Sequence, residues 1–174
     1  GLAIKPGDVI SSYAGKTIEV IDTDAEGRLI LADALAYAVK EYKPDVMIDM
    51  ATLTGSIVGA LGPQAAGLFS KNDQLASSLA ASGDQTGERV WRMPMYDEYH
   101  DDMQSDIADI KNLSEKPYAG AITAAKFLEY FTSEHTSWAH LDIAGSARQE
   151  RASSLGPKGA TGVGVLTLLQ YLGA

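Results

Sequence analysis

Short apolar runs at the start of the chain predict a hairpin followed by a helix. Residues 9–13 and 17–21 are β-rich and flank Ala14-Gly15-Lys16, a sequence that favours a turn. Residues 29–42 are strong helix formers and are apolar on nearly every face, which is typical of a buried helix. Lys43-Pro44 ends that helix because proline cannot continue it.

The rest of the chain alternates between strand and helix patterns. Strands are expected at 45–53, where the strand should be buried, and at 65–70 and 138–143. Helices are expected in the Ala/Ser-rich stretch before Glu88, at 119–133 as an amphipathic helix, and at 163–172. Residues 54–62 are glycine-rich, and 145–159 form a polar loop. This alternation predicts an α/β fold built in layers.

Composition narrows the classes of protein. The 174 residues are 45% hydrophobic and suit one compact domain, and the net charge of -9 disfavours binding to nucleic acid. The absence of cysteine excludes disulfides, thiolate metal sites and cysteine nucleophiles. Without an apolar run of membrane-spanning length or a signal peptide, we expect a cytoplasmic protein with no membrane partner. The chain begins with Gly1 rather than Met.

The densest candidate chemistry lies just before the first helix. Asp24, Glu26 and Arg28 alternate, so in extended chain the two carboxylates share a face, whereas in a helix they diverge by about 200°. We therefore expect extended chain entering the helix. Crowded carboxylates lose solvation and repel one another unless a cation compensates them. An exposed turn that caps the helix and a site for magnesium, manganese or zinc carry equal weight on these grounds.

The segment 23–29, Thr-Asp-Ala-Glu-Gly-Arg-Leu, resembles the signature of the leucyl (cytosol) aminopeptidases, a family of dinuclear metallopeptidases. Other segments resemble the same family in order along nearly the whole chain. They are Gly-Lys-Thr-Ile-Glu-Val at 15–20, Leu-Ala-Asp-Ala-Leu at 31–35, Ala-Thr-Leu-Thr-Gly at 51–55, Val-Trp-Arg-Met-Pro at 90–94, Ser-Asp-Ile-Ala-Asp at 105–109, Ala-Gly-Ala-Ile-Thr-Ala-Ala at 119–125 and Trp-Ala-His-Leu-Asp-Ile-Ala-Gly at 138–145.

The resemblance implies a role for each matching residue. Asp24 would bind one metal ion and Glu26 would bridge the pair. Arg28 would hold a bicarbonate or the reacting centre and stabilise the tetrahedral intermediate. The pocket for the substrate side chain would be lined by Thr52, Leu53 and Gly55.

The resemblance also implies the fold and the activity. Residues 1–174 would be the C-terminal part of a catalytic domain with helix–sheet–helix layers and a mixed sheet. The reaction would be release of N-terminal amino acids, leucine-like ones included, from peptides. Two divalent ions would serve as cofactors, manganese or zinc, with magnesium or cobalt as alternatives. The assembly would be a homo-hexamer.

The sequence departs from the family in two ways. Asp22 stands where the family usually has asparagine, which adds a charge beside the site. The family's other ligands, a lysine and two aspartates, and its catalytic lysine lie N-terminal to the signature, and Lys5 and Asp8 are not in the matching context. The alternative hypothesis is therefore that the isolated chain is a catalytically incomplete folding or assembly module, with Gly1 marking a truncation.

Histidines offer weaker candidates. His140 and Asp142 alternate on an expected strand and permit a zinc pair, although a hydrogen-bonded structural histidine is favoured. His100 and His135 lie among polar residues and are expected at the surface.

Three further features have simpler explanations than a binding site. Trp91, Met93 and Met95 form an apolar cluster that predicts core packing, with a subunit interface as second choice. Residues 15–17 end like a phosphate-binding loop but lack its first glycine, and 159–164 have the wrong glycine spacing for a dinucleotide site. A hairpin turn and a loop before a helix are expected at these positions.

Overall fold

The structure is a computed structural model that describes residues 3–132, 136–152 and 156–173. The chain divides into two compact units, which are described separately below. The first comprises residues 1–47 and 95–136, and the second comprises residues 48–94 and 137–174. Both combine helices with a mixed sheet, so the predicted α/β class is confirmed.

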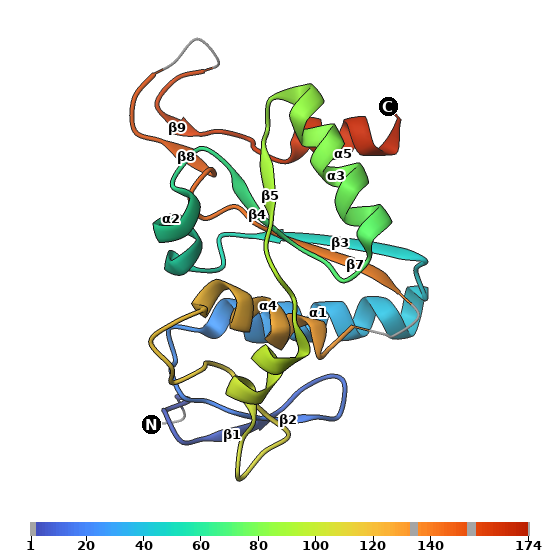
Figure 1. Ribbon diagram of the computed structural model, residues 1–174. Coiled ribbons are helices and arrows are strands. Elements are labelled where there is room, and N and C mark those ends of the chain that lie inside the picture. Colours follow the sequence, from blue (N-terminus) through green and yellow to red (C-terminus); the bar gives the residue numbers. More distant parts are fainter. Residues whose placement is uncertain (1–2, 133–135, 153–155, 174) are drawn as a thin grey trace. The chain divides into compact units, whose positions relative to one another are not determined.

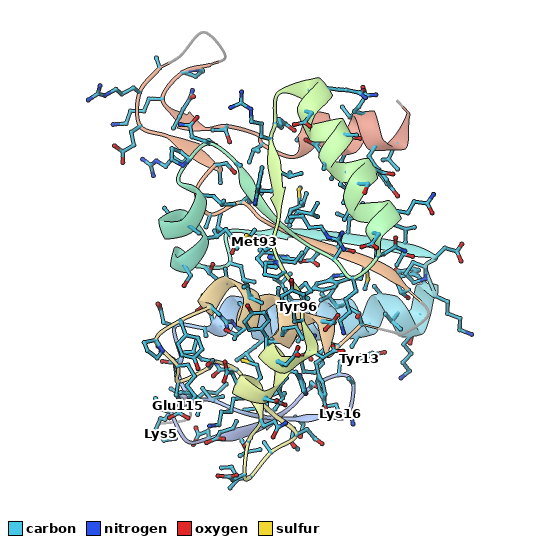
Figure 2. The ribbon with its side chains drawn as sticks, viewed as in Figure 1. Lys5, Tyr13, Lys16, Met93, Tyr96 and Glu115 are labelled. Atoms are coloured by element: carbon cyan, nitrogen blue, oxygen red, sulfur yellow. The ribbon has the colours of Figure 1, made fainter. Side chains whose placement is uncertain are left out.

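The first unit contains the predicted hairpin. Strands β1 (Val9–Ser11) and β2 (Thr17–Glu19) pair antiparallel across a turn in which Gly15 has a φ of 72°. Lys16 lies at the tip of this hairpin (Figure 2), with its ammonium group 5.8 Å from the centroid of the Tyr130 ring. A short strand distant in sequence, β6 (Ile110–Lys111), adds to β2 in parallel. The unit also holds helix α1 (Glu26–Tyr42), the 3-10 helix η1 (Asp97–Met103) and helix α4 (Gly120–Glu129).

Helix α1 is buried on one face, not on every face as predicted. Its buried residues follow the i, i+4, i+7 spacing of a single stripe: Arg28, Ala32, Leu35 and Ala36. Ile30 on another face is 69% exposed. The helix ends at Lys43, which takes the left-handed conformation and donates its N–H to the Val39 carbonyl, just before Pro44.

Helix α4 shows the opposite departure, because its burial is not confined to one face. Every residue from 121 to 128 is buried, and α4 lies beside α1 (Figure 1). Three of these residues are alanines, which let neighbouring chain approach closely on several sides. Lys126 is only 2% exposed, and its ammonium group pairs with Glu129 and, at 3.5 Å, with Asp97. This charge therefore stays paired in its buried position.

The second unit is built on a four-stranded sheet with the order β3-β7-β4-β5 (Figure 1). Strand β4 pairs in parallel with β5 and antiparallel with β7, so the sheet is mixed. The strands are β3 (Val46–Ala51), β4 (Ala66–Phe69), β5 (Val90–Arg92) and β7 (Ser137–Asp142). The predicted strands at 65–70 and 138–143 are confirmed, and the strand at 45–53 is confirmed but is only partly buried.

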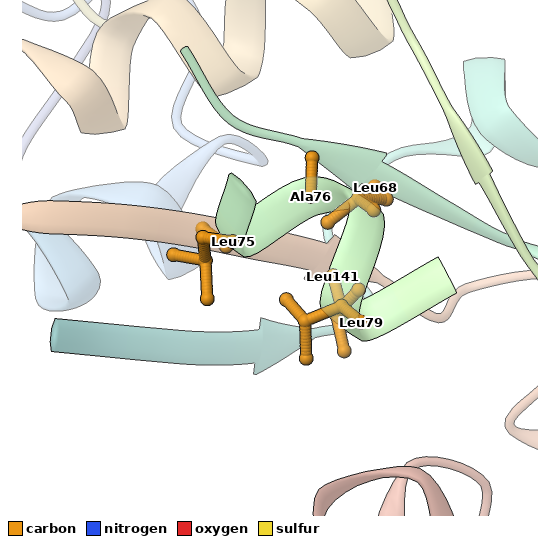
Figure 3. Packing of buried hydrophobic residues seen from close by; sticks show 6 residues of the cluster. Leu68, Leu75, Ala76, Leu79 and Leu141 are labelled. Atoms are coloured by element: carbon orange, nitrogen blue, oxygen red, sulfur yellow. The ribbon is translucent and has the colours of Figure 1, made fainter. Parts of the chain in front are cut away.

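Helix α3 (Asp73–Thr86) closes the core of this sheet and packs against helix α5 (Val165–Leu172). Leu75, Ala76 and Leu79 of α3 meet Leu68 of β4 and Leu141 of β7 (Figure 3). All five side chains are at most 4% exposed. The predicted helices before Glu88 and at 163–172 are therefore confirmed.

The sequence analysis missed helix α2 (Gly55–Leu61), which lies in the glycine-rich segment. The Thr54 hydroxyl accepts the backbone N–H of Ile57 at 3.1 Å and thereby caps the helix. Strands β5 and β6 and helix η1 were not predicted either. Two short strands, β8 (Arg148–Gln149) and β9 (Gly159–Ala160), pair within or beside the expected polar loop. Among the described residues, no helix is long and apolar enough to cross a membrane.

Replacing Gly145 by alanine should destabilise the second unit. A methyl group at this position would overlap the backbone carbonyl of Gly62, and backbone cannot rotate away as a side chain can. We expect Gly145→Ala to lower the free energy of unfolding by about 1–3 kcal/mol. Gly59→Ala is the matched control: it lies inside α2 with open space around it and should gain about 0.5–1 kcal/mol. Denaturant unfolding of the full-length protein measures both, and equal values would contradict the overlap.

Candidate functional site

The candidate residues of the first unit lie where the chain enters α1. Asp24 is in the turn before the helix, whereas Glu26 and Arg28 are already helical. The prediction of extended chain through residue 28 is therefore wrong: the helix begins at Glu26, three residues earlier than the apolar pattern indicates. An arginine is a strong helix former, and a charged first turn hides the start of a helix from a hydrophobic pattern.

The acidic residues before α1 do not cap the helix by a side-chain hydrogen bond. The N-cap residue of α1 is Ala25, whose methyl side chain cannot accept a hydrogen bond from the first turn. Asp24 and Glu26 are exposed, and their carboxylates form no hydrogen bond or ion pair with the residues that the structure describes. Glu26 still lies in the first turn, where the helix dipole favours a negative charge. Both carboxylates therefore remain available to a ligand.

Arg28 is the buried member of the group. It is 5% exposed, and its Nη1 donates a hydrogen bond to the backbone carbonyl of Asn112 at 2.8 Å. A guanidinium has five N–H donors in a fixed plane, so this contact helps to fix the orientation of the group.

The turn before α1 is held by the same residue, Asn112, which the sequence analysis did not single out. Its side-chain Oδ1 accepts the backbone N–H groups of Ile21 at 2.8 Å and of Asp22 at 3.4 Å. Its Nδ2 donates to the backbone carbonyls of Asp22 at 2.7 Å and of Ala25 at 3.5 Å. Ninety residues separate the partners, so no local pattern could reveal this contact.

The stretch leading to Asn112 is fastened to β2 by side chains. The Asp109 carboxylate accepts both the backbone N–H and the hydroxyl of Thr17 at 2.8 Å, and the Ser105 hydroxyl donates to Glu19 at 2.5 Å. The backbone hydrogen bond from Thr17, followed by that from its hydroxyl, lowers the pKa of Asp109 below its ordinary value. Beside Asn112, the Glu115 carboxylate raises the pKa of Lys111.

The two other aspartates near the turn have structural partners. One carboxylate oxygen of Asp22 accepts the backbone N–H of Asp24 at 2.9 Å, which closes a local turn. Asp33 accepts the backbone N–H of Tyr13 at 2.7 Å and so ties α1 to the hairpin. The Asp33 carboxylate is therefore engaged by the hairpin.

The expected substrate-binding residues belong to the second unit. Thr52 and Leu53 lie on the loop between β3 and α2, and Gly55 is the first residue of α2. Thr52 and Gly55 are exposed, and Leu53 is half-buried. The buried carboxylate of Asp142 holds this loop: it accepts the Leu53 N–H at 3.1 Å and the Thr54 hydroxyl at 2.7 Å. Asp142 lies at the end of β7, so a strand distant in sequence shapes the loop.

His140 has a structural environment, and the zinc-pair alternative is not favoured. Its Nδ1 lies 2.6 Å from an Asp49 oxygen, and the other Asp49 oxygen accepts the Trp138 indole N–H at 2.7 Å. Asp142 is engaged elsewhere, by Leu53 and Thr54. The described residues contain no group of three or more histidine, aspartate or glutamate side chains that could hold a metal.

His100 and the cluster of Trp91, Met93 and Met95 are buried to different extents. The His100 ring is half-buried and stacks on Tyr130 at 5.6 Å, while His135 lies outside the described residues. Trp91 is 66% exposed, so core packing is wrong for that residue; Met93 (Figure 2) is half-buried and Met95 is buried. Edge strand β5 is only three residues long and alternates its faces, which turns the Trp91 indole outward.

The segment 159–164 before α5 is only partly the loop that was expected, because residues 159–160 form β9 and the loop covers 161–164. Its last glycine, Gly164, has a φ of 94° and precedes the helix. The Glu88 carboxylate accepts the N–H groups of Gly164 at 3.0 Å and of Thr167 at 2.8 Å. A carboxylate already occupies this helix N-terminus, which leaves no room there for a phosphate.

A cavity of about 560 Å³ lies along η1 in the first unit. None of the residues expected at the site lines it; its lining residues are Met95, Tyr96, Asp97, Glu98 and Asp101. The candidate carboxylates therefore lie outside this cavity.

The fold and these residues define a mixed α/β protein with two exposed carboxylates and a buried arginine at the start of one helix. The chain belongs to the cytosol aminopeptidase family, because residues 1–169 match the family description "Cytosol aminopeptidase family, catalytic domain". The resemblance seen in the sequence is thereby confirmed.

Individual relatives agree with this membership. A probable cytosol aminopeptidase of Chlorobium limicola is 54% identical over 172 residues, which cover 99% of this chain and 34% of the relative. One from Chlorobaculum tepidum is 56% identical, with coverage of 99% and 34%. A solved structure of a tomato leucine aminopeptidase mutant matches with a TM-score of 0.90 and 46% identity, covering 97% of this chain and 32% of that one. The chain thus spans about a third of the length of these relatives.

Asp22 should stabilise the turn before α1 by accepting a hydrogen bond rather than by its negative charge. Asparagine keeps an oxygen at the position that accepts the Asp24 N–H, so Asp22→Asn should leave the unfolding free energy unchanged. Asp22→Ala removes the acceptor and should cost about 0.5–1 kcal/mol. Asp45→Ala, a change at another exposed aspartate, is the control. Denaturant unfolding decides the point: an Asn variant as unstable as the Ala variant would contradict it.

Proposed function

We propose that the full-length protein carrying this chain is a metal-dependent aminopeptidase that releases N-terminal residues, leucine-like ones included, from peptides. Membership of the cytosol aminopeptidase family and the names of the relatives support this proposal. The observation that carries it is the pair of exposed carboxylates, Asp24 and Glu26, which no described residue engages, four and two residues before the buried Arg28.

Asp24 and Glu26 fit a hard divalent cation by their chemistry, since both offer oxygen ligands that no described residue occupies. Two carboxylates are too few for two metal ions, so the remaining ligands would come from outside these 174 residues. Manganese or zinc would be the ions, with magnesium or cobalt as alternatives. When bound, such a pair supplies a Lewis acid and lowers the pKa of a water molecule.

Arg28 would act on the negative charge that develops on the scissile carbonyl oxygen. A buried guanidinium stabilises such a charge more than an exposed one, because less water screens it. The Asn112 carbonyl fixes one of its nitrogens, so little rearrangement would be needed during the reaction. The family resemblance also implies that Arg28 would hold a bicarbonate.

The loop of Thr52, Leu53 and Gly55 would receive the substrate side chain. Its backbone is held by the buried Asp142 and by the Thr54 cap of α2. Gly55 presents no side chain, and a Cβ there would meet nothing within 4 Å among the described residues. Rigid backbone next to open space is what a side-chain pocket requires.

The assembly we propose is a cytosolic homo-hexamer, as the family resemblance implies. The 66% exposure of Trp91, beside the half-buried Met93, supports a subunit interface on this edge of the second unit. The 174 residues by themselves would be catalytically incomplete, because the described residues hold no group of three metal-binding side chains.

Glu26→Gln tests the metal-binding role with little change in shape. Loss of the negative charge should reduce hydrolysis of a leucine anilide with manganese by about 100-fold or more in the full-length protein, since even the loss of an outer-sphere partner costs about 10–100-fold. Asp73→Asn is the matched control, because Asp73 occupies the first turn of α3 as Glu26 does in α1. Activity of Glu26→Gln equal to that of the control would exclude the role.

Gly55→Ala tests the pocket. Because the new methyl group has open space, the fold should persist, and the methyl should compete with the substrate side chain. We expect kcat/KM to fall about 10-fold or more for a leucine anilide and less for an alanine anilide. Gly59→Ala in the same helix is the control. An equal loss for both substrates would argue against a pocket at Gly55.

A further inference from the structure

Asn112 connects to the candidate site more extensively than any other residue described above. It is completely buried and follows directly after β6. A buried amide needs partners for two N–H donors and one carbonyl acceptor, or it destabilises the fold. All of these groups find their partners on the turn between β2 and α1.

The side-chain amide spans the turn that carries Asp24. Its oxygen contacts the backbone N–H of Ile21 at one end, and its nitrogen contacts the backbone carbonyl of Ala25 at the other. Asp24 lies between these two anchors, and Glu26 follows immediately. The amide therefore fixes the backbone on either side of the first candidate ligand and just before the second.

The backbone N–H and carbonyl of Asn112 form two more hydrogen bonds. Its N–H donates to the Glu19 carbonyl at 2.9 Å and so extends the parallel pairing of β6 with β2. Its carbonyl accepts Nη1 of Arg28 at 2.8 Å. One residue thus fixes the end of the strand, the turn and the guanidinium.

We propose that Asn112 is a positioning residue that sets the relative placement of Asp24, Glu26 and Arg28. The catalytic consequence rests on the function proposed above, whereas the geometric role does not. Asparagine suits the task because one plane presents an acceptor to two N–H groups and donors to two carbonyls. An aspartate would bring an oxygen against the carbonyls of Asp22 and Ala25, and an alanine would leave all four backbone groups without this partner.

The positioning role predicts that the side chain of Asn112 affects the carboxylates more than Arg28. Asn112→Ala removes all side-chain contacts to the turn, and Asn112→Asp replaces the two hydrogen bonds donated by Nδ2 with repulsion between oxygens. Both variants retain the backbone carbonyl that holds Arg28. These substitutions should therefore alter the positions of the Asp24 and Glu26 carboxylates. In the full-length protein we expect manganese to bind about 10–100-fold more weakly, and kcat to fall while KM for a leucine anilide stays nearly constant.

The experiment is calorimetric titration of manganese into the metal-free full-length protein, combined with steady-state kinetics and denaturant unfolding. Asn72→Ala is the matched control. Asn72 accepts the Leu75 N–H at 2.9 Å as the cap of α3 and donates to the Ser137 hydroxyl at 2.8 Å, so the loss of both contacts in the alanine variant also costs stability. Weaker manganese binding in the Asn112 variants but not in Asn72→Ala supports positioning. Equal loss of stability with unchanged manganese affinity overturns it.

Hydrogen exchange tests the positioning role independently of the proposed aminopeptidase activity. Its measurement on the wild-type protein does not require a stable variant. In the wild-type protein the N–H of Ile21 should exchange slowly, because its only described acceptor is the Asn112 side chain. In Asn112→Ala, which lacks the acceptor oxygen, the amides of Ile21 and Asp22 should exchange faster while α3 is unchanged. Rapid exchange of Ile21 in the wild type overturns the positioning role. Protected amides in a protein without peptidase activity would reject only the proposed function.

Discussion

The parallel pairing of β6 with β2 is the interaction on which the first unit's candidate site depends. It brings Asn112 against a turn that lies ninety residues earlier in the chain. Parallel strands need a long connecting segment, so closing this contact costs more chain entropy than a local contact does. Hydrogen bonds between β2 and the side chains of Asp109 and Ser105 secure the same register. The start of α1 is therefore shaped by tertiary contacts and not by a local capping sequence.

In the second unit a loop before a helix is also held by a side chain distant in sequence, which is here a carboxylate rather than an amide. There the buried carboxylate of Asp142, at the end of β7, accepts hydrogen bonds from Leu53 and Thr54. In both units a polar group from a strand distant in sequence satisfies the backbone or hydroxyl donors of a loop that leads into a helix. Buried polar groups are costly unless fully satisfied, so such contacts specify one loop conformation against others. This leaves the exposed residues of each loop available for a ligand.

Where the sequence pattern was wrong, the cause was long-range packing or a hidden cap. Helix α2 was missed because glycines weaken the helical pattern, although Thr54 caps it. Helix α4 was expected to have one polar face, but its Lys126 is buried through pairing with Glu129. The exposed Trp91 was expected in the core because hydrophobicity alone does not reveal which face of an edge strand meets the solvent.

The sequence by itself determined the elements with strong local patterns, the α/β class and the family. The hairpin, α3, β4 and β7 follow from periodicity and turn chemistry, which act over a few residues. The ordered segments around Asp24 and Glu26 identified the family, as the match over residues 1–169 confirmed. Only the tertiary structure decided that α1 begins at Glu26, that one face of it is buried and that Asn112 holds its entry. Those features depend on hydrogen bonds between residues far apart in sequence, and a local pattern carries no information about such pairs.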